Sequence, residues 1–212
     1  MIKHRDIFLK SEGDRWFARN KNSLRKKNYK NDFIISAVKK LKKNNKICIL
    51  EIGCGDGERL NLLSCNKKIK CFGLEPSLTA INSQKNKKIK ILRGTAESIP
   101  FENKKFDILI FSFCLYLCDD EDLSKIVSEA LRVTKNTSFI IIYDFFIKGI
   151  KYFKYKHNKK IKIRKMDCAK LFGWHPRIKL IEKKKYYEKK NIVFEKRIYN
   201  QTALYVFKKN FK

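Results

Sequence analysis

The sequence ICILEIGCGDG at residues 47–57 decides the fold of this chain. Its first six residues are apolar except for Glu51, and so short an apolar run ending in glycine is typical of a strand buried on both faces. Three alternating glycines follow, which let the backbone turn sharply and let a ligand come close. Residues 58–63 can then form a helix. The stretch therefore predicts the strand, glycine turn and helix that hold nucleotides in doubly wound sheets.

The spacing of these glycines argues against a dinucleotide. A dinucleotide-binding turn has the pattern G-x-G-x-x-G, whereas this turn ends as G-x-G-x-G at Gly57. Glu51 lies two residues before the first glycine, where its carboxylate would repel a phosphate and attract an ammonium or sulfonium group. Short glycine motifs also occur in ordinary loops, so the motif needs support from the rest of the chain.

Further strands and helices alternate along the chain, which predicts a mostly parallel sheet covered on both faces. The expected strands are 69–75, 89–92, 106–111 and 139–144, followed by two closing strands at 178–187 and 203–207. Glu75 ends the second strand, close to the spacing of about 20 residues at which an acid binds ribose hydroxyls in nucleotide-binding sheets. Pro76 and Ser77 then end the strand and begin a helix.

Two more helices are predicted from apolar spacing and from their capping residues. The first precedes residue 47 and has Asn31 or Asp32 as its cap. The second covers residues 123–131, and Asp119 and Asp120 are its expected caps.

The composition is that of a globular chain. The 212 residues are 43% hydrophobic and include 16 Phe and 9 Tyr, which is enough for one domain with a sizeable core. No apolar run approaches the ~20 residues that a membrane helix needs, and the first residues lack the apolar core of a signal peptide, so we expect a cytoplasmic protein. The seven cysteines form no C-x-x-C pair and there are three histidines, so we expect reduced cysteines and no metal site.

The formal charge is +30, from 51 Lys and Arg against 21 Asp and Glu. Clustered basic residues can neutralise the phosphates of a nucleic acid. Lys, Asn and Ile are abundant together, however, as a coding sequence rich in A and T would produce, and runs of charge are often only solvated surface. Both interpretations stay open at this point, and the sequence does not indicate an oligomeric state.

Four ordered features make residues 47–144 resemble the class I S-adenosylmethionine-dependent methyltransferases, in particular the small-molecule branch that includes ubiquinone-biosynthesis C-methyltransferases. They are E-I-G-C-G-D-G at 51–57, Glu75, A-E-S-I-P-F at 96–101 and F-D-I-L-I-F at 106–111 with its following turn. The resemblance implies a three-layer Rossmann-like fold whose seven-stranded sheet ends in an antiparallel pair. It also implies S-adenosylmethionine as cofactor.

The resemblance further implies which residues surround the cofactor. They are Glu51, Gly53, Cys54, Gly55, Gly57, Glu75, Pro76, Ala96, Glu97, Ser112 and Phe113.

Each group has an implied role. The glycines would line the methionine part, Glu51 would organise its ammonium group, and Glu75 would bind the ribose hydroxyls. Residues 96–97 would meet the adenine, and residues 112–113 would lie under the sulfonium. Relatives often carry a histidine just after this point, but this chain has Phe-Cys-Leu-Tyr at 113–116, which leaves the catalytic base unknown.

One domain is expected, divided into four parts by the resemblance. These are an N-terminal arm and helix at 1–45, a cofactor-binding core at 47–144, an aromatic lid insertion at 145–176 and closing strands at 177–212. The substrate candidates come from the arm, the turn after the fourth strand and the insertion. They are Trp16, Tyr116, His157, Trp174 and His175, and the candidate proton acceptors are His157, His175, Tyr116 and Asp144.

Three hypotheses about function follow. The first is methyl transfer to a small molecule, such as an oxygen of a sugar or of another metabolite, and an anionic acceptor would suit the basic region after residue 146. The second is an RNA methyltransferase that uses this basic C-terminal surface; Cys114 alone does not support cytosine C5 chemistry, because its companion motifs are missing. The third is a non-catalytic cofactor sensor, which the intact set of Glu51, Gly53 and Glu75 argues against.

Overall fold

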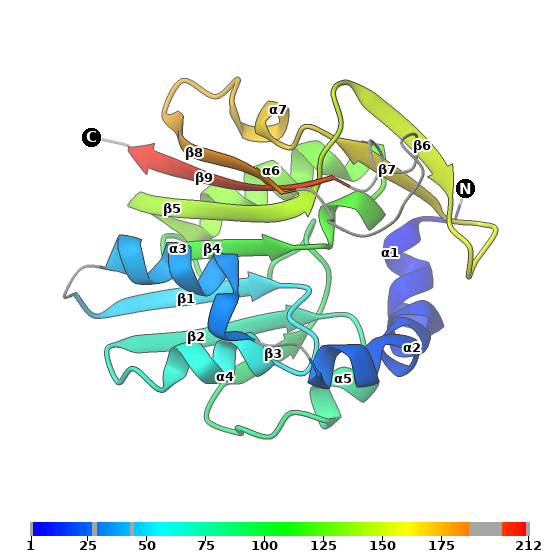
Figure 1. Ribbon diagram of the computed structural model, residues 1–212, viewed down its shortest axis with the longest axis horizontal. Helices are drawn as coiled ribbons and strands as arrows, with labels where there is room; N and C mark the ends of the chain where they lie inside the picture. The colour runs from blue at the N-terminus through cyan, green and yellow to red at the C-terminus, as the bar shows by residue number, and fades with distance from the viewer. Residues whose placement is uncertain (1, 27–28, 43–44, 187–200, 211–212) are drawn as a thin grey trace.

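The structure is a computed structural model that describes residues 2–26, 29–42, 45–186 and 201–210. Its main feature is a seven-stranded sheet with the order β3-β2-β1-β4-β5-β9-β8 (Figure 1). The strands are β1 (Ile47–Ile52), β2 (Ile69–Glu75), β3 (Lys90–Arg93), β4 (Phe106–Ser112), β5 (Thr134–Phe145), β8 (Ile178–Tyr186) and β9 (Thr202–Asn210). Strands β1 to β5 pair in parallel, whereas β9 is antiparallel to β5 and to β8. The predicted α/β class and its antiparallel closing pair are confirmed; Tyr187 of the expected closing strand lies outside the described residues.

Helices cover both faces of this sheet (Figure 1). They are α1 (His4–Ile7), α2 (Gly13–Arg25), α3 (Phe33–Lys42), α4 (Glu58–Ser64), α5 (Leu78–Asn82), α6 (Leu123–Val133) and α7 (Ala169–Phe172). Side chains of α3 and α4, such as Val38 and Leu60, pack on one face of the sheet. Side chains of α6 and α7, such as Ala130 and Phe172, pack on the other. The chain therefore has three layers with an apolar core on each side of the sheet.

Capping residues fix where two of these helices begin. The Oδ1 atom of Asp32 accepts hydrogen bonds from the backbone N–H groups of Ile34 and Ile35, both at 3.0 Å, which confirms the predicted cap of α3. The prediction for α6 was wrong, because neither Asp119 nor Asp120 caps it. A 3-10 turn at Asp120–Asp122 precedes α6 instead, and both carboxylates bind other parts of the chain.

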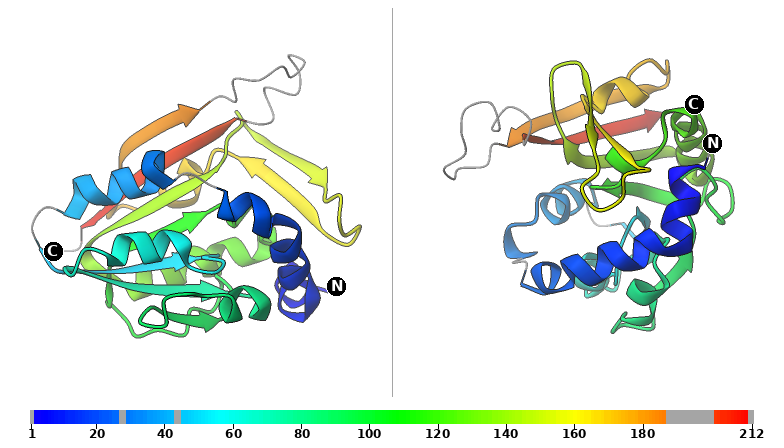
Figure 2. Two further views of the ribbon diagram at one scale, coloured as in Figure 1. Left: turned by 60° about the horizontal axis from the view of Figure 1, so that its bottom comes forward. Right: turned by 90° about the vertical axis from the view of Figure 1, so that its right-hand side faces the viewer.

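Two segments lie at the carboxyl ends of the parallel strands, to the right in Figure 1. One is the N-terminal arm, in which a π-helical turn, Phe8–Glu12, joins α1 to α2. The other is a β-hairpin of β6 (Ile150–Lys154) and β7 (Lys162–Met166), separate from the main sheet, which the sequence did not predict as strands. Figure 2 shows the hairpin extending beside the arm.

The arm and the hairpin are in direct contact. The guanidinium of Arg19 in α2 donates to the carboxylate of Glu12 and, at 3.0 Å, to the hydroxyl of Tyr155, just after β6. Tyr155 and Ile161 of the hairpin pack with Ile7 of α1. Among the described residues, no helix is long and apolar enough to cross a membrane.

Candidate active site

A cavity of about 620 Å³ lies where β1, β2 and β4 end, and the N-terminal arm forms one of its walls. This position is where parallel α/β sheets bind ligands, because the strand ends and the following turns leave a crevice there. Twelve of the residues singled out from the sequence line it. They are Trp16, Glu51, Gly53, Cys54, Gly55, Glu75, Pro76, Ala96, Glu97, Ser112, Phe113 and Tyr116.

The glycine turn forms the floor of the cavity next to β1. Gly53 and Gly55 have φ values of +68° and +59°, a conformation that side chains disfavour. A Cβ atom on Gly53 would lie 3.0 Å from the Cβ atom of Cys114, so this glycine also permits close packing against the next loop. A Cβ atom on Gly55 would meet nothing within 4 Å, which means that Gly55 faces open space in the cavity.

A buried ion-pair network holds Glu51 at the end of β1. The guanidinium of Arg59 in α4 donates to the carboxylate of Glu51, to Asp32 at 3.2 Å and to the hydroxyl of Ser112 at 3.3 Å. Burial lowers the pKa of Arg59, but the two carboxylates more than offset this, so its pKa is raised and the side chain stays charged. The network holds the Glu51 carboxylate beside the glycine turn, and the guanidinium of Arg59 neutralises part of its negative charge.

Glu75, at the end of β2, is tied to the same turn. Its Oε2 atom accepts a hydrogen bond from the backbone N–H of Gly55 at 2.8 Å, and its Oε1 atom accepts one from Ser77 at 2.9 Å. Burial raises the pKa of Glu75 to about 7, and these two N–H groups work against the rise. Each carboxylate oxygen has two lone pairs, so each can accept one further hydrogen bond from a ligand.

Polar side chains also line the cavity near residues 95–97 and where the arm meets the loop after β4. The hydroxyl of Thr95 donates to Glu97 at 2.6 Å, and Arg5 of the arm binds both carboxylate oxygens of Asp122 at 2.6 and 2.7 Å. The backbone N–H of His4 donates to Asp119 at 2.7 Å. The arm is therefore attached to the loop after β4 through carboxylates that also line the cavity.

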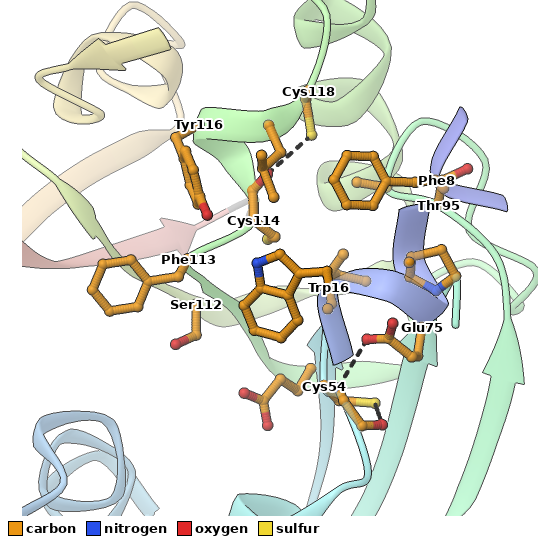
Figure 3. Close-up of a pocket in the computed structure, with 18 of the residues that line it drawn as sticks. Phe8, Trp16, Cys54, Glu75, Thr95, Ser112, Phe113, Cys114, Tyr116 and Cys118 are labelled. Atoms are coloured by element: carbon orange, nitrogen blue, oxygen red, sulfur yellow. Dashed lines mark hydrogen bonds between the residues drawn. The ribbon is translucent and has the colours of Figure 1, made fainter. Parts of the chain in front are cut away.

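Aromatic side chains surround the end nearest β4. Figure 3 shows the Trp16 indole pointing into the cavity, between Ser112 and Phe113 on one side and Glu75 on the other. Phe113 packs edge-on against Phe145, with ring centroids 5.4 Å apart, and has a φ of +51°. A phenylalanine in this conformation is strained, and such strain is concentrated at functional sites.

The candidate catalytic groups of this region are either hydrogen-bonded to the backbone, as Asp144 is, or held in their neutral form, as Tyr116 and Cys114 are. Asp144 does not line the cavity; its carboxylate accepts hydrogen bonds from the backbone N–H groups of residues 115, 116 and 145 beneath it. Burial raises the pKa of the Tyr116 hydroxyl and raises the pKa of the Cys114 thiol well above its ordinary value. The Cys114 thiol is therefore no nucleophile at neutral pH.

Besides Asp144, four of the residues singled out from the sequence do not line the cavity. Gly57 begins α4 with a φ of +76°, next to Ile91. His157 is exposed in the hairpin turn, and Trp174, 69% exposed, lies with His175 just after α7. The spacing of aromatics suggested one lid at 145–176, but the hairpin and α7 separate them in space, so these three aromatic candidates have no support from the geometry.

The sequence did not single out several residues that line the cavity. Asn20, Ser23 and Leu24 follow Trp16 at helical spacing, and this periodicity could have shown that they share its face. Arg59 carried no such signal, because its contact with Asp32 brings together residues 27 positions apart in the sequence.

The charge of the cavity is opposite to that of the chain. Its charged lining residues are six acids and two arginines, and no described lysine lines it, whereas the whole chain has 51 basic and 21 acidic residues. The acids are Glu51, Asp56, Glu75, Glu97, Asp119 and Asp122. A lining of this sign favours a positively charged ligand.

Comparison with known proteins identifies the fold and the family. The sequence profile described as a methyltransferase domain matches residues 50–142, which span the glycine turn, Glu75 and β4. The chain belongs to the class I S-adenosylmethionine-dependent methyltransferases. S-adenosylmethionine is therefore the cofactor of this methyltransferase domain. The matches do not distinguish the ubiquinone-biosynthesis branch from its relatives.

Individual similar proteins add less to this assignment. An uncharacterized protein of Methanocaldococcus jannaschii is 33% identical over 154 residues, which are 68% of this methyltransferase and 57% of that protein, so the chain spans little more than half of its relative. The 1,6-didemethyltoxoflavin-N1-methyltransferase of Burkholderia thailandensis has a TM-score of 0.71 at 10% identity, with 97% of this chain and 89% of that chain covered. A Haloferax volcanii methyltransferase in complex with the activator Trm112 has a TM-score of 0.67 at 14% identity, with 94% and 98% covered. These two structures show the shared fold.

Proposed function

We propose that this methyltransferase transfers a methyl group from S-adenosylmethionine to a small acceptor that is uncharged where it enters the cavity. The observation that carries the proposal is the division of the cavity lining. Glu51 and Glu75 line the part next to the glycine turn, where a cation would bind, while the turn directly after β4, at residues 112–116, contributes aromatic and uncharged polar side chains. A phosphate-linked acceptor, which the basic C-terminal region suggested, would meet no lysine in the described lining.

We propose these roles for the residues that would hold the cofactor. Glu75 has lone pairs left for two ribose hydroxyls, and Gly55 leaves room for the ligand to come against the backbone. Glu51, held by Arg59, would attract the ammonium group. When bound, S-adenosylmethionine supplies a methyl group on a positively charged sulfur. The volume of about 620 Å³ suits the cofactor together with a small acceptor group.

Trp16, Phe113 and Tyr116 would position a planar acceptor and exclude water, and ring faces attract a cation. Asn20 and Ser23 offer hydrogen bonds on the same wall. The bound cofactor would supply its methyl group to an oxygen or nitrogen of the acceptor, and the electron pair of the carbon–sulfur bond would stay on sulfur. No described histidine lines the cavity, so the acceptor proton would pass to water or to one of the lining carboxylates. The acceptor would be one that releases this proton readily, such as an amine or an acidic hydroxyl.

The test uses S-adenosylmethionine labelled on its methyl group. The purified protein is incubated separately with the metabolite, RNA and protein fractions of a cell extract, with Glu75→Ala as the inactive control. We expect label in the metabolite fraction for the unchanged protein and none for the variant. Label confined to the protein fraction would contradict the proposal, and label that is independent of Glu75 would contradict the assigned cofactor site.

A base of RNA is a second candidate acceptor. It is favoured by a strongly basic hairpin next to the cavity, because a base is planar and uncharged while its phosphates are anionic. Label in the RNA fraction would support this candidate over the first.

A further inference from the structure

The β6–β7 hairpin has the opposite charge to the cavity that it adjoins. Residues 145–166 include nine Lys or Arg and no Asp or Glu, whereas the whole chain has 21 acidic residues among 212. A compositional bias towards lysine acts along the entire chain, so it does not explain why acids are missing from this segment and concentrated in the cavity. The hairpin therefore needs an explanation of its own.

Five exposed lysines of the hairpin form no ion pair with the acidic residues that the structure describes. They are Lys154, Lys156, Lys159, Lys160 and Lys162. Within the part of the chain that the structure describes, the one ion pair made by the hairpin joins Arg164 to Asp120 and involves none of these five. Lys154 also lies directly opposite Lys162 in the strand pair. Like charges in this position destabilise a hairpin, and a bound anion between them would remove the repulsion.

An exposed aromatic ring lies on the same strand pair. Tyr152 is 52% exposed, yet its hydroxyl donates to Asp120 at 2.6 Å, and Asp120 is also bound by Arg164, the residue opposite Tyr152 in the register. The ring is thus held in place with much of its surface open to solvent. Proteins bind single-stranded nucleic acids with such a combination, because lysines contact the phosphates and aromatic rings stack on the bases.

The hairpin is joined to the wall of the cavity. Tyr155 and Ile161 pack in one cluster with Trp16 and Leu117, both of which line the cavity. The backbone N–H of Lys162 also contacts the His4 imidazole, one residue before Arg5 of the cavity wall. A chain of phosphates lying along the hairpin lysines would therefore pass the cavity entrance.

We propose that the β6–β7 hairpin is a docking arm for the phosphate backbone of a single-stranded nucleic acid. Residues 156–160 at its tip are Lys, His, Asn, Lys and Lys, with no apolar side chain to insert into a membrane. The carboxylates of the adjacent cavity would repel a phosphate. A planar, uncharged base would instead fit against the aromatic side chains next to β4. The docking arm goes beyond the proposed function, and it holds whether or not the bound base is the methyl acceptor.

The test measures binding of a fluorescein-labelled 20-nucleotide single-stranded RNA by anisotropy at several salt concentrations. In one variant the five hairpin lysines are changed to glutamate. In the matched control, five exposed lysines distant from the hairpin are changed in the same way. They are Lys39, Lys46, Lys67, Lys87 and Lys88. Cofactor affinity and thermal unfolding are measured for both variants, so that loss of RNA binding is distinguished from loss of the cofactor site or of the fold.

We expect the hairpin variant to lose RNA affinity by at least about 30-fold at 0.1 M salt. The slope of the logarithm of the binding constant against the logarithm of salt concentration should become shallower by about 3 to 4. The control should lose no more than about threefold. Tyr152→Ala should weaken binding by about tenfold, whereas Tyr152→Phe, which keeps the ring, should stay within about threefold of the unchanged protein. Equal losses in the hairpin and control variants would overturn the proposal, as would tighter binding to phosphatidylserine vesicles than to the RNA.

Discussion

The cavity and the β6–β7 hairpin lie side by side and have opposite charge. The cavity is lined by six acids and two arginines, while residues 145–166 carry nine basic residues and no acid. In the cavity, carboxylates such as Glu75 and Glu51 are bound by a backbone N–H group and by an arginine. In the hairpin, the ion pair between Arg164 and Asp120 is the one formed within the described part of the chain, and it includes none of the five lysines at 154–162. A uniform bias would give both regions the same excess of lysine. The difference in sign is the one that a site for a cationic cofactor and a docking arm for phosphates would each require.

The largest effect is expected for Arg59, the more deeply buried of the two arginines that line the cavity. Arg59→Met would leave the buried carboxylates of Glu51 and Asp32 without their shared guanidinium. We expect the free energy of unfolding to fall by about 3–5 kcal/mol, since one partner of a buried ion pair is removed. Urea denaturation measures this. Lys156→Met in the hairpin is the control and should change stability by less than about 0.5 kcal/mol. Equal effects would mean that the cavity network is no more structural than the hairpin lysines.

Glu75 provides the next test, because it is the carboxylate that joins β2 to the glycine turn. Glu75→Ala removes the acceptor of the Gly55 and Ser77 N–H groups and the proposed acceptor of two ribose hydroxyls. We expect affinity for S-adenosylmethionine to fall by about 100-fold, measured by calorimetry. Glu102→Ala, whose side chain is 84% exposed, should leave affinity unchanged. An unchanged Kd in Glu75→Ala would place the cofactor elsewhere.

The pH dependence of ligand binding sharpens the comparison further. Burial raises the pKa of Glu75 to about 7, so its ionised form, the better acceptor, becomes predominant between pH 6 and pH 8. Adenosine has the ribose but no amino group that titrates in this range. Its affinity should rise by up to about tenfold from pH 6 to pH 8 and stay flat in Glu75→Gln. A flat profile in the unchanged protein would contradict the role of Glu75.

The same raised pKa has an effect on stability with the opposite sign. The ordinary pKa of the carboxyl is 4.5, so the unfolded chain has released this proton where the folded chain still holds it. The contribution of Glu75 to the free energy of unfolding therefore falls as pH rises from about 4.5 to about 7. Glu75→Gln should remove this part of the slope in urea denaturation.

The smallest effect concerns the two tryptophans of the chain, one inside the cavity and one outside it. Trp16 points into the cavity, whereas Trp174 is 69% exposed outside it. S-adenosylmethionine should therefore change the fluorescence of Trp16 alone. In Trp174→Phe the cofactor-induced change should persist, and in Trp16→Phe it should vanish with cofactor affinity reduced by less than about tenfold. A response that follows Trp174 would contradict the position of the cavity.

The sequence was sufficient to predict the main sheet, because its signals are local. Buried strands appear as short apolar runs, and the glycine turn and Glu75 each follow a strand directly, so their meeting at the carboxyl ends comes from parallel pairing alone. Asp32 was recognised as a cap for the same reason, since a cap acts within three residues.

Contacts between distant segments could not be predicted in this way. Asp119 and Asp120 looked like caps, but the arm and the hairpin bind them instead. The burial pattern of β6 does not alternate, because Ile150, Lys151 and Tyr152 are all exposed, so the usual sequence signal of a strand is missing. Aromatic spacing grouped His157 with Trp174, although the hairpin and α7 diverge in space. In each case the deciding interaction joins residues far apart in the chain.

The contact of Arg19 with both Glu12 and Tyr155 has one more consequence. It connects α2, which carries Trp16 into the cavity, to the hairpin proposed to bind phosphates. If occupancy of one region shifts this contact, thermodynamic reciprocity requires that the two ligands change each other's affinity by the same factor. Arg19→Ala would then uncouple the two equilibria while leaving each binding surface intact.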